Sequence, residues 1–532
     1  MLRRTSCGLL SILGALATCG SMYALHGLRN PWASFATPIQ IFFALVFLLT
    51  TVDHIWTILW WIAYTPVPPT DRQLLPNITV VIPVYNESHF VRYALNSILQ
   101  SSYPKHRLEV VVVDDGSSDD SWEHISDTAT VYADAGIRYR TVKHDTNMGK
   151  RSAIISGFSI ASGDFIVSLD SDSVLERCSL SNLVAPMMLN SRIGGVAGHL
   201  SALNVDGKFI PRLLDILFES SGNTPRAAQS RACGAVTILP GALSAYRTVA
   251  IRPLFADLRE TTFMGSPINH GEDVELTLGL LRGGWVTVCQ SNAVVHTIAP
   301  ESARRAFLMY TRWERSSYVY LCLGFFQVAV AAIVKQLTSH FRSNIMGDGT
   351  TKDFGVDKEE EAVYTPMSLI KVAKSVMGSL FLLVNMTSTA VGNLLFPFLV
   401  YSQVSTISLQ PQVLLLGCIS TLLLAGFRTL LFYADCSEKG DDTRDDALPR
   451  EECVKLDYWG KDMGELKIYG RKARLLWRLQ YGGLAMFFSF KLYYVDIISR
   501  IVDFEKPAMA NEIAHLRPCM IDSLSSRFSE IS

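Results

Sequence analysis

Residues 165–172 of the chain read FIVSLDSD, an apolar run that ends abruptly in two carboxylates separated by one serine. Two earlier stretches have the same form: ITVVIP at residues 78–83 is followed by VYNES, and EVVVV at residues 109–113 is followed by Asp114 and Asp115. Short continuous apolar runs rich in β-branched residues are typical of buried parallel strands. Ligands bind beyond the carboxyl ends of such strands, so we expect an α/β fold with its chemistry at these polar ends.

The composition of the whole chain narrows the class of protein. Of its 532 residues, 49% are hydrophobic and 18% are charged, whereas soluble domains carry about 25% charged residues. Lys and Arg number 48 and Asp and Glu number 49, so the net charge is 48 − 49 = −1. A chain with no excess of positive charge is not expected to bind nucleic acid through a general electrostatic attraction. The high hydrophobic content also makes a wholly soluble protein unexpected.

The hydrophobic residues are concentrated at the two ends of the chain. Residues 8–25 carry no charge, and residues 40–62 are long enough for a helix to cross a hydrocarbon core, which is about 30 Å thick. The first stretch also has the form of a cleavable signal peptide, so that alternative stays open. Two further candidate spans lie near residues 377–402 and 411–433.

The basic residues predict how these spans are oriented. Arg3 and Arg4 favour a cytoplasmic start, and the ten Lys and Arg side chains of residues 435–478 favour a cytoplasmic loop. An even number of crossings then follows the α/β region, so we interpret the apolar residues 318–334 as a helix at the membrane interface. Residues 481–498 could span the bilayer or lie flat. We therefore expect a multi-pass integral protein of the plasma membrane whose catalytic domain is cytoplasmic.

These boundaries divide the chain into six predicted regions. Asp53 and His54 fall inside the second span, where ionisable groups are costly in lipid, so we expect them to line a polar path or to pair within the helix bundle. In sequence order the regions are two membrane helices (1–65), the α/β domain (66–317), an interface helix with a charged insertion (318–376), further membrane helices (377–434), the cytoplasmic loop (435–478), and a membrane or interface helix with a tail (479–532).

Acidic and basic side chains cluster at the predicted strand ends. Two carboxylates at positions i and i+2, as in Asp170 and Asp172, suit Mg²⁺ or Mn²⁺ and a diphosphate bound to it, although DSD is also a common turn composition. Lys150 follows Gly149 in a turn where an ammonium can offset phosphate charge, or it begins a solvated helix. Asp273 precedes a helical stretch and either caps that helix or acts as a general base.

Seven motifs occur in a fixed order between residues 78 and 318. They are PVYNES (83–88), VVDDGSSDD (112–120), NMGKRSA (147–153), LDSDS (169–173), LPGALSAYR (239–247), HGED (270–273) and TRW (311–313). This series resembles the family 2 inverting glycosyltransferases. Within them it is similar to the processive membrane synthases, namely hyaluronan synthase, chitin synthase, the rhizobial chito-oligosaccharide synthase and cellulose synthase. The resemblance implies the GT-A fold of nucleotide-diphospho-sugar transferases.

The resemblance also assigns roles to individual residues of this chain. It implies that Asp273 is the general base and that Asp172, with Asp170, holds Mn²⁺ or Mg²⁺. The residues implied to bind the UDP-sugar donor are Pro83, Tyr85, Glu87, Asp115, Lys150, Asp170 and Arg312. The residues implied to border the acceptor sugar are Gly241, Ala242, Leu243, Glu272 and Trp313.

Two positions depart from the family pattern. Met309 stands where the family's Q-x-x-R-W motif has Gln, which removes an amide able to form hydrogen bonds. The base motif reads Gly271-Glu272-Asp273 where hyaluronan and chitin synthases usually have GDD, so the final Asp is retained. Residues 459–461 (WGK) are a candidate counterpart of the W-G-T-R stretch of hyaluronan synthases, or a simple turn.

Together these features predict a synthase embedded in the lipid bilayer. It would polymerise UDP-sugars into a β-linked polysaccharide and pass the growing polysaccharide across the membrane. TRWERS at residues 311–316 is similar to hyaluronan synthases, which favours UDP-GlcNAc with UDP-GlcA as donors. The alternatives are a chitin synthase that uses UDP-GlcNAc alone, and a non-processive membrane glycosyltransferase. A transporter or receptor would need no acids at strand ends.

Overall fold

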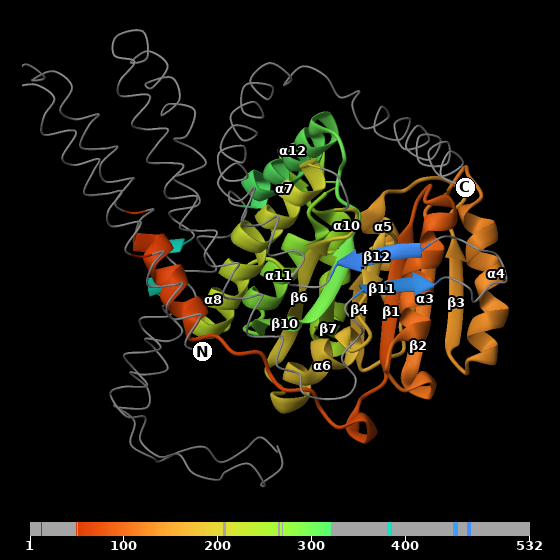
Figure 1. The fold of residues 1–532 in the computed structure, drawn as a ribbon, viewed down its shortest axis with the longest axis horizontal. Helices are drawn as coiled ribbons and strands as arrows, with labels where there is room; N and C mark the ends of the chain where they lie inside the picture. Colours follow the sequence, from red (N-terminus) through yellow and green to blue (C-terminus); the bar gives the residue numbers. More distant parts are fainter. Residues whose placement is uncertain are drawn as a thin grey trace, which may run out of the picture.

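The computed structural model of the chain describes residues 52–205, 209–263, 266–268 and 270–320, two strands at 451–455 and 465–469, and a few helical residues elsewhere (12, 49, 380–381 and 384–385). Its centre is an eight-stranded mixed sheet in the order β3-β2-β1-β4-β7-β6-β10-β5, with helices on both faces (Figure 1).

One half of the sheet consists of four parallel strands, three of which are the strands predicted from apolar runs. β1 lies between β2 and β4, with Ile78 opposite both Leu108 and Phe165. Every residue of these three strands is buried, which explains why their sequences are continuously apolar rather than alternating. The four strands are β1 (Ile78–Val84), β2 (Leu108–Asp114), β3 (Arg138–Lys143) and β4 (Phe165–Leu169).

The other half of the sheet is mixed. β7 runs antiparallel to both β4 and β6, β10 pairs with β6 in parallel, and β5 runs antiparallel to β10 at the sheet's edge. The strands are β5 (Ser173–Leu175), β6 (Ile193–Ala202), β7 (Leu243–Arg247) and β10 (Val286–Thr297). The sheet therefore changes from parallel to antiparallel at β4, directly beside the DSD turn.

Helices cover the two faces of the sheet with separate apolar cores. One core contains Leu95, Ile125 and Leu183, from α3, α4 and α6. The other contains Ile154 and Leu280, from α5 and α11. The longer helices of the domain are α3 (Val91–Gln100), α4 (Ser121–Asp134), α5 (Lys150–Ile160), α6 (Ser179–Leu189), α7 (Phe209–Leu217), α8 (Thr224–Cys233), α10 (Phe255–Glu260), α11 (Glu272–Arg282) and α12 (Ala303–Tyr320).

Short elements complete the domain. They are η1 (Arg72–Leu74), η2 (Ser88–Phe90), η3 (Lys105–Arg107), the π-helical η4 (Phe218–Asn223), α9 (Thr248–Ile251), η5 (Arg252–Leu254), and the paired strands β8 (Thr262–Phe263) and β9 (Ser266–Pro267). Farther along the chain, β11 (Glu451–Lys455) pairs antiparallel with β12 (Glu465–Tyr469) inside the predicted loop 435–478.

Two glycines position α5 against the parallel strands, one by a close contact and one by its backbone conformation. A Cβ on Gly157 would lie 2.3 Å from Cγ1 of Val81, so only glycine lets the helix approach β1 this closely. Gly149, which precedes the helix, has φ +88°, a left-handed conformation that side chains rarely adopt. The first residue of α5, Lys150, is thereby held at the carboxyl edge of the sheet.

The apolar N-terminal region contacts this domain through a helix at residues 52–62. Ile58 and Trp61 pack against Ala227 and Ala228 of α8, and the helix lies beside α8 in Figure 1. Beyond it, the Tyr64 hydroxyl donates to the carbonyl of Cys289 at 2.9 Å. The end of the second predicted span therefore rests on α8 and β10.

Most of the predicted membrane region lies outside the described residues. This holds for nearly all of the predicted spans at 8–25 and 377–402, for residues 40–51 of the second span apart from residue 49, and for the span at 411–433. It also holds for the interface helix and insertion beyond residue 320, and for residues 459–461 and 479–532. Within the described part of the chain, no helix combines the length and the apolar character needed to cross a bilayer. The six regional boundaries stay predictions.

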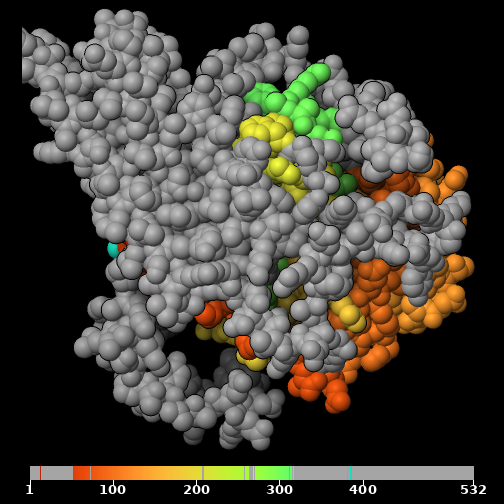
Figure 2. All heavy atoms as spheres, viewed as in Figure 1, coloured from red at the N-terminus to blue at the C-terminus, as the bar shows by residue number. Residues whose placement is uncertain are grey.

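In the view of Figure 2, the first half of the domain contributes the orange surface at one side of the molecule.

Candidate active site

Lys150 is the centre of the candidate site. Its Nζ lies 2.6 Å from Oδ1 of Asp170 and 3.8 Å from Oε1 of Glu272. Burial opposes its charge, but attraction to these two carboxylates outweighs burial and raises the pKa of Lys150. Three motifs far apart in the sequence, NMGK, LDSD and HGED, therefore meet around one ammonium group.

Gly241 brings a fourth motif to the same place. A Cβ at this position would lie 3.3 Å from Nζ of Lys150 and 3.8 Å from Oδ1 of Asp170. Ala242 and Leu243 follow directly, but their side chains are buried in the apolar core. All three of these residues are predicted to border the acceptor, but only Gly241 faces the Lys150 cluster, and the other two can offer only backbone atoms.

Asp273, the predicted general base, begins the turn of α11 beside Glu272. Burial and the neighbouring charge of Glu272 raise its pKa to about 6, with a further contribution from Asp170, while Lys150 and the backbone N–H of Val274 act in the opposite direction. That N–H donates to Oδ1 of Asp273 at 2.8 Å and holds its carboxylate. A carboxylate with this pKa is ionised at neutral pH and remains a better base than an ordinary Asp.

Arg151 supports this turn from the neighbouring helix. Its guanidinium pairs with Glu275 of α11 and donates to the carbonyls of His270, at 3.2 Å, and Leu258, at 3.0 Å. Its side chain is only 9% exposed. Arg151 belongs to the NMGKRSA motif, but the motif alone predicts no role for it. Its contacts show that it holds the HGED turn against α5.

Asp115 organises the nucleotide side of the site. Its Oδ1 accepts from the backbone N–H of Met148 at 3.0 Å and lies 2.8 Å from Nδ1 of His144, whose Nε2 contacts Oγ of Ser156 at 3.0 Å. These contacts tie the loop after β3 to the loop after β2. His144 had no assigned role, but its place directly after β3, the neighbour of β2, is the signal that could have identified it.

A close approach of two loops completes this side. Gly116 has φ +71°, and a Cβ there would lie 2.5 Å from the carbonyl carbon of Thr146. Any side chain at this position would push the two loops apart. Asp114, by contrast, is fully buried, and its Oδ1 accepts from the N–H of Ser117 at 3.1 Å. Asp114 thus stabilises the turn.

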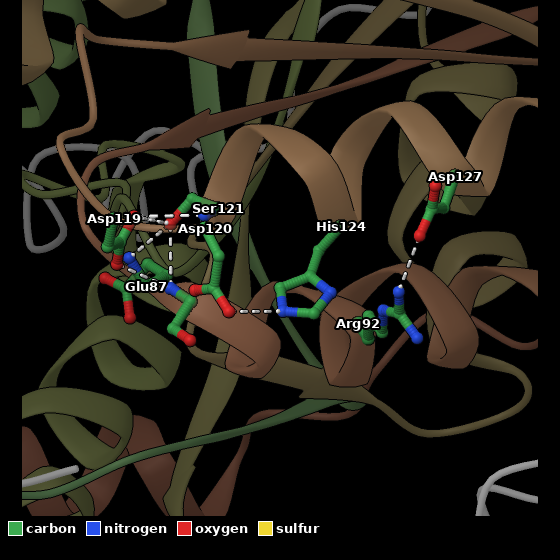
Figure 3. Close-up of polar contacts among 8 residues, drawn as sticks. Glu87, Arg92, Asp119, Asp120, Ser121, His124 and Asp127 are labelled. Atoms are coloured by element: carbon green, nitrogen blue, oxygen red, sulfur yellow. Dashed lines mark hydrogen bonds and ion pairs between the residues drawn. The ribbon is translucent and has the colours of Figure 1, made fainter.

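The PVYNES loop is fixed by the first turn of α4, as Figure 3 shows. Oγ of Ser121 accepts from the backbone N–H groups of Glu87, at 2.9 Å, and Ser88, at 2.7 Å, and donates to Oδ1 of Asp119 at 2.5 Å. Oδ2 of Asp119 also accepts from the Ser88 N–H at 2.9 Å. These bonds hold Asn86 and Ser88 at φ +50° and +49°, values that cost strain outside glycine.

Two further contacts involve α4, one within the helix and one to α3. His124 lies 3.2 Å from Asp120, and Arg92 lies 3.0 Å from Asp127 (Figure 3). Of the predicted donor-binding residues in this region, Pro83 is buried within β1 opposite Val113, while Tyr85 and Glu87 are half-buried in the loop that Ser121 holds.

Asp170 and Asp172 provide two carboxylates at the end of β4. Oδ1 of Asp172 accepts from the hydroxyl of Thr297 at 3.3 Å. No cluster of three or more His, Cys, Asp or Glu suited to a metal ion occurs among the described residues. Because Mg²⁺ is commonly held by one or two carboxylates together with substrate phosphates, this pair fits a cation shared with a diphosphate.

α12 carries the last motif along the edge of the site. Arg312 and Trp313 are exposed, and Arg312 is near enough to Lys150 to oppose its positive charge. The Trp313 ring lies 6.1 Å from that of Phe218 in η4. Met309, at the Gln position of the family motif, packs against the small apolar core of α7 and η4. Met309 therefore contributes apolar packing at a position where a Gln would offer an amide.

Part of the chain is similar to a known protein family. Residues 79–255 match the family described as Glycosyl transferase family 2. This part of the chain is therefore similar to the family 2 glycosyltransferases. This result confirms the predicted enzyme class and agrees with the GT-A-like sheet, whose parallel half and β7 lie within the matched residues.

Relatives of the family 2 domain carry a more specific name. The chain is 35% identical over 246 residues to an N-acetylglucosaminyltransferase of Azorhizobium caulinodans, covering 46% of this chain and 60% of that protein. It is 34% identical over 251 residues to one of Rhizobium meliloti, covering 47% and 58%. The chain thus spans about three fifths of these relatives' length.

Among solved structures, the mannosyltransferase PcManGT from Pyrobaculum calidifontis in complex with GDP-Man and Mn²⁺ aligns over 75% of this chain and 99% of that chain. The identity is 19% and the TM-score is 0.40.

Proposed function

We propose that the chain transfers N-acetylglucosamine from UDP-GlcNAc to the hydroxyl of an acceptor sugar, with inversion at the anomeric carbon. The observation that carries this proposal is the meeting of four motifs around Lys150, with Asp170 at 2.6 Å, Glu272 at 3.8 Å and Gly241 alongside. The choice of sugar is supported by the name of the relatives, N-acetylglucosaminyltransferase.

Asp273 acts as the general base in the proposed reaction. Its carboxylate takes the proton of the acceptor hydroxyl, and the hydroxyl oxygen forms a bond to the anomeric carbon on the face opposite the diphosphate. The bond from that carbon to the diphosphate oxygen breaks, and its electron pair leaves with UDP. An α-linked donor therefore gives a β-linked product. The raised pKa of about 6 suits Asp273 to accept this proton near neutral pH.

The leaving diphosphate needs positive charge. Lys150 supplies one charge beside Asp170, and Arg312 lies at the same end of the sheet. Asp170 and Asp172 would hold Mn²⁺ or Mg²⁺, which when bound offsets the charge of the diphosphate. Because Lys150 already contacts Asp170, the donor phosphates would share this ammonium group with that carboxylate.

The nucleoside is proposed to bind at the carboxyl ends of β1 and β2. Asp115 and the loop holding Tyr85 and Glu87 form this region, and both are fixed by the contacts of His144 and Ser121. Loops that are already ordered before the ligand binds reduce the conformational entropy lost on binding. The uridine would therefore meet a preformed site.

We extend the proposal to a processive, membrane-embedded enzyme whose catalytic domain faces the cytoplasm. Two features support this extension: the apolar stretches at both ends of the sequence, and the docking of the helix at 52–62 on α8. The product would then be a β-linked polymer of N-acetylglucosamine that leaves along the membrane helices. Hyaluronan, which the TRWERS motif favoured, requires UDP-GlcA as a second donor.

A donor test separates these products. The purified full chain in detergent, with Mn²⁺, is incubated with UDP-GlcNAc in the presence or absence of UDP-GlcA, and UDP release and product length are measured. We expect a chitinase-sensitive polymer from UDP-GlcNAc alone. A polymer that requires both donors and is degraded by hyaluronidase would replace this proposal with hyaluronan synthesis. Products of a few sugars would remove processivity, and no UDP release above the Asp273→Asn level would overturn the proposed transferase activity.

A further inference from the structure

The docked helix at residues 52–62 carries a carboxylate, Asp53, in a stretch predicted to lie in the membrane. A carboxylate is costly in lipid and is expected to have a polar partner. Asp53 has one, because Nδ2 of Asn385 donates to its Oδ1 at 2.8 Å. Asn385 itself belongs to the predicted third span, so the contact joins two apolar regions 332 positions apart in the sequence.

The contact continues into the catalytic domain through α8. Nε2 of Gln229 donates to Oδ1 of Asn385 at 2.9 Å. Oε1 of Gln229 accepts from both the backbone N–H and the hydroxyl of Thr237, at 3.1 and 3.3 Å. Gln229 is only 5% exposed. We call the four residues Asp53, Asn385, Gln229 and Thr237 the amide relay.

The chemistry of the side chains fixes the direction of the amide relay. An ionised Asp53 can only accept, so Asn385 must turn its NH₂ group toward it and its oxygen toward Gln229. Gln229 must then turn its own NH₂ group toward Asn385 and its oxygen toward Thr237. The backbone N–H of Thr237 can only donate, so both ends of the amide relay require the same orientation of the two amides.

Thr237 lies immediately before the segment that reaches the active site. The N–H of Leu239 donates to the hydroxyl of Thr277 at 3.0 Å, and that hydroxyl donates to the carbonyl of Asp273 at 2.6 Å. Two residues further, Gly241 faces Lys150. A shift of Thr237 would therefore displace the chain that borders both the base turn and the Lys150 cluster.

We infer that Gln229 is a positioning residue, and that the amide relay transmits the placement of the apolar helices to the acceptor-side segment 237–241. This role rests on the proposed transferase function. It predicts that disturbing the relay impairs use of the acceptor more than binding of the donor, because the loops around Asp115 and Ser121 make none of these contacts.

A charge exchange within the relay tests the inference. Asn385→Asp places a second carboxylate beside Asp53, whereas Asp53→Asn keeps an oxygen that can accept from Asn385. In the double variant the carboxylate and the amide trade places, and Gln229 can still donate to residue 385. We expect Asn385→Asp to lower the rate of transfer to the acceptor by about tenfold, a typical coupling for contacting residues, with Asp53→Asn nearly unaffected. The double variant should recover most of the loss.

Hydrogen exchange of the same variants provides a readout that needs no activity. The amides of Thr237 and Leu239 should exchange faster in Asn385→Asp and in Gln229→Leu, and should recover protection in the double variant. The amides of β1 serve as the internal control for global unfolding.

The outcomes are distinct. Unchanged exchange and unchanged kinetics in Asn385→Asp, or a double variant no better than the single one, would overturn the relay. A shift confined to the donor KM would overturn its acceptor role. A wild-type chain that transfers no sugar but shows the exchange pattern would refute the proposed function and leave the relay standing.

Discussion

The nucleotide side and the Lys150 side of the site are built by different physical means. The loops around Asp115 and Ser121 are held chiefly by backbone N–H groups that donate to side-chain oxygens. The region around Lys150 is held by charges, with Asp170, Glu272 and Asp273 close to one ammonium. The first arrangement fixes the shape of the loops. The second arrangement also determines how tightly Asp273 holds its proton.

This difference follows from where each side lies in the sheet. The nucleotide side sits on the parallel half, where consecutive strand ends carry short polar loops. The Lys150 side lies where β4 meets the antiparallel β7, so α5, the DSD turn and the start of α11 converge there. Substitutions on the Lys150 side should therefore change chemistry and its pH dependence. Substitutions on the nucleotide side should change only the affinity for UDP.

The largest effect is expected for Asp273→Asn. General-base catalysis contributes about 10²- to 10⁴-fold, so transfer to the acceptor should fall by that factor while UDP binding, measured by calorimetry, is retained. The variant keeps an oxygen that can accept from the Val274 N–H. A loss of transfer below about tenfold would exclude Asp273 as the base.

The same variant should not be less stable than the wild type. The folded state raises the pKa of Asp273 to about 6, so the stability gained from its proton is present at low pH and is lost as pH rises through about 6. Asn carries no charge at any of these values. At neutral pH its melting temperature should equal or exceed that of the wild type, and a lower value would show that Asp273 also holds the fold.

A smaller effect is expected when the charge beside the base is removed. Transfer should decline as pH falls through about 6, because Asp273 then binds a proton. Glu272→Gln deletes the neighbouring negative charge, which should lower the pKa of Asp273 and move the acid limb of the pH–rate profile to lower pH by about one unit. Asp127→Asn, at the distant ion pair with Arg92, is the control. An unmoved limb in Glu272→Gln would mean that another group titrates.

The parallel half could be predicted closely from the sequence. The expected strands at 78–83, 109–113 and 165–169 match β1, β2 and β4 to within one residue. Short continuous runs of β-branched residues are typical of buried strands, which is why these three could be located. Residues 88–100, whose apolar side chains recur at helical spacing and so predict one helix, form η2 followed by α3. The polar ends of these strands indicated the candidate site before any contact was known.

The mixed half could not be predicted in the same way. β5, with three residues, and the reversed β7 depend on neighbours that lie far away in the chain. The side chains that support the site were missed for a related reason. Ser121, Arg151 and Gln229 act through contacts with backbone groups or with residues distant in sequence, and neither composition nor motif order reveals such partners.

The smallest effect should come from the nucleotide side, in Ser121→Ala. This change removes the oxygen that accepts from the Glu87 and Ser88 N–H groups. A hydrogen bond contributes about 0.5–1.5 kcal/mol, so UDP affinity measured by calorimetry should fall by about 2- to 12-fold per bond lost. Ser118→Ala is the matched control, because its backbone N–H keeps the 2.8 Å bond to Asn86. Since no titrating group changes beside Asp273, the acid limb of the pH–rate profile should stay in place. A moved limb in Ser121→Ala would show that the two sides are coupled and would remove the distinction between shape and proton affinity.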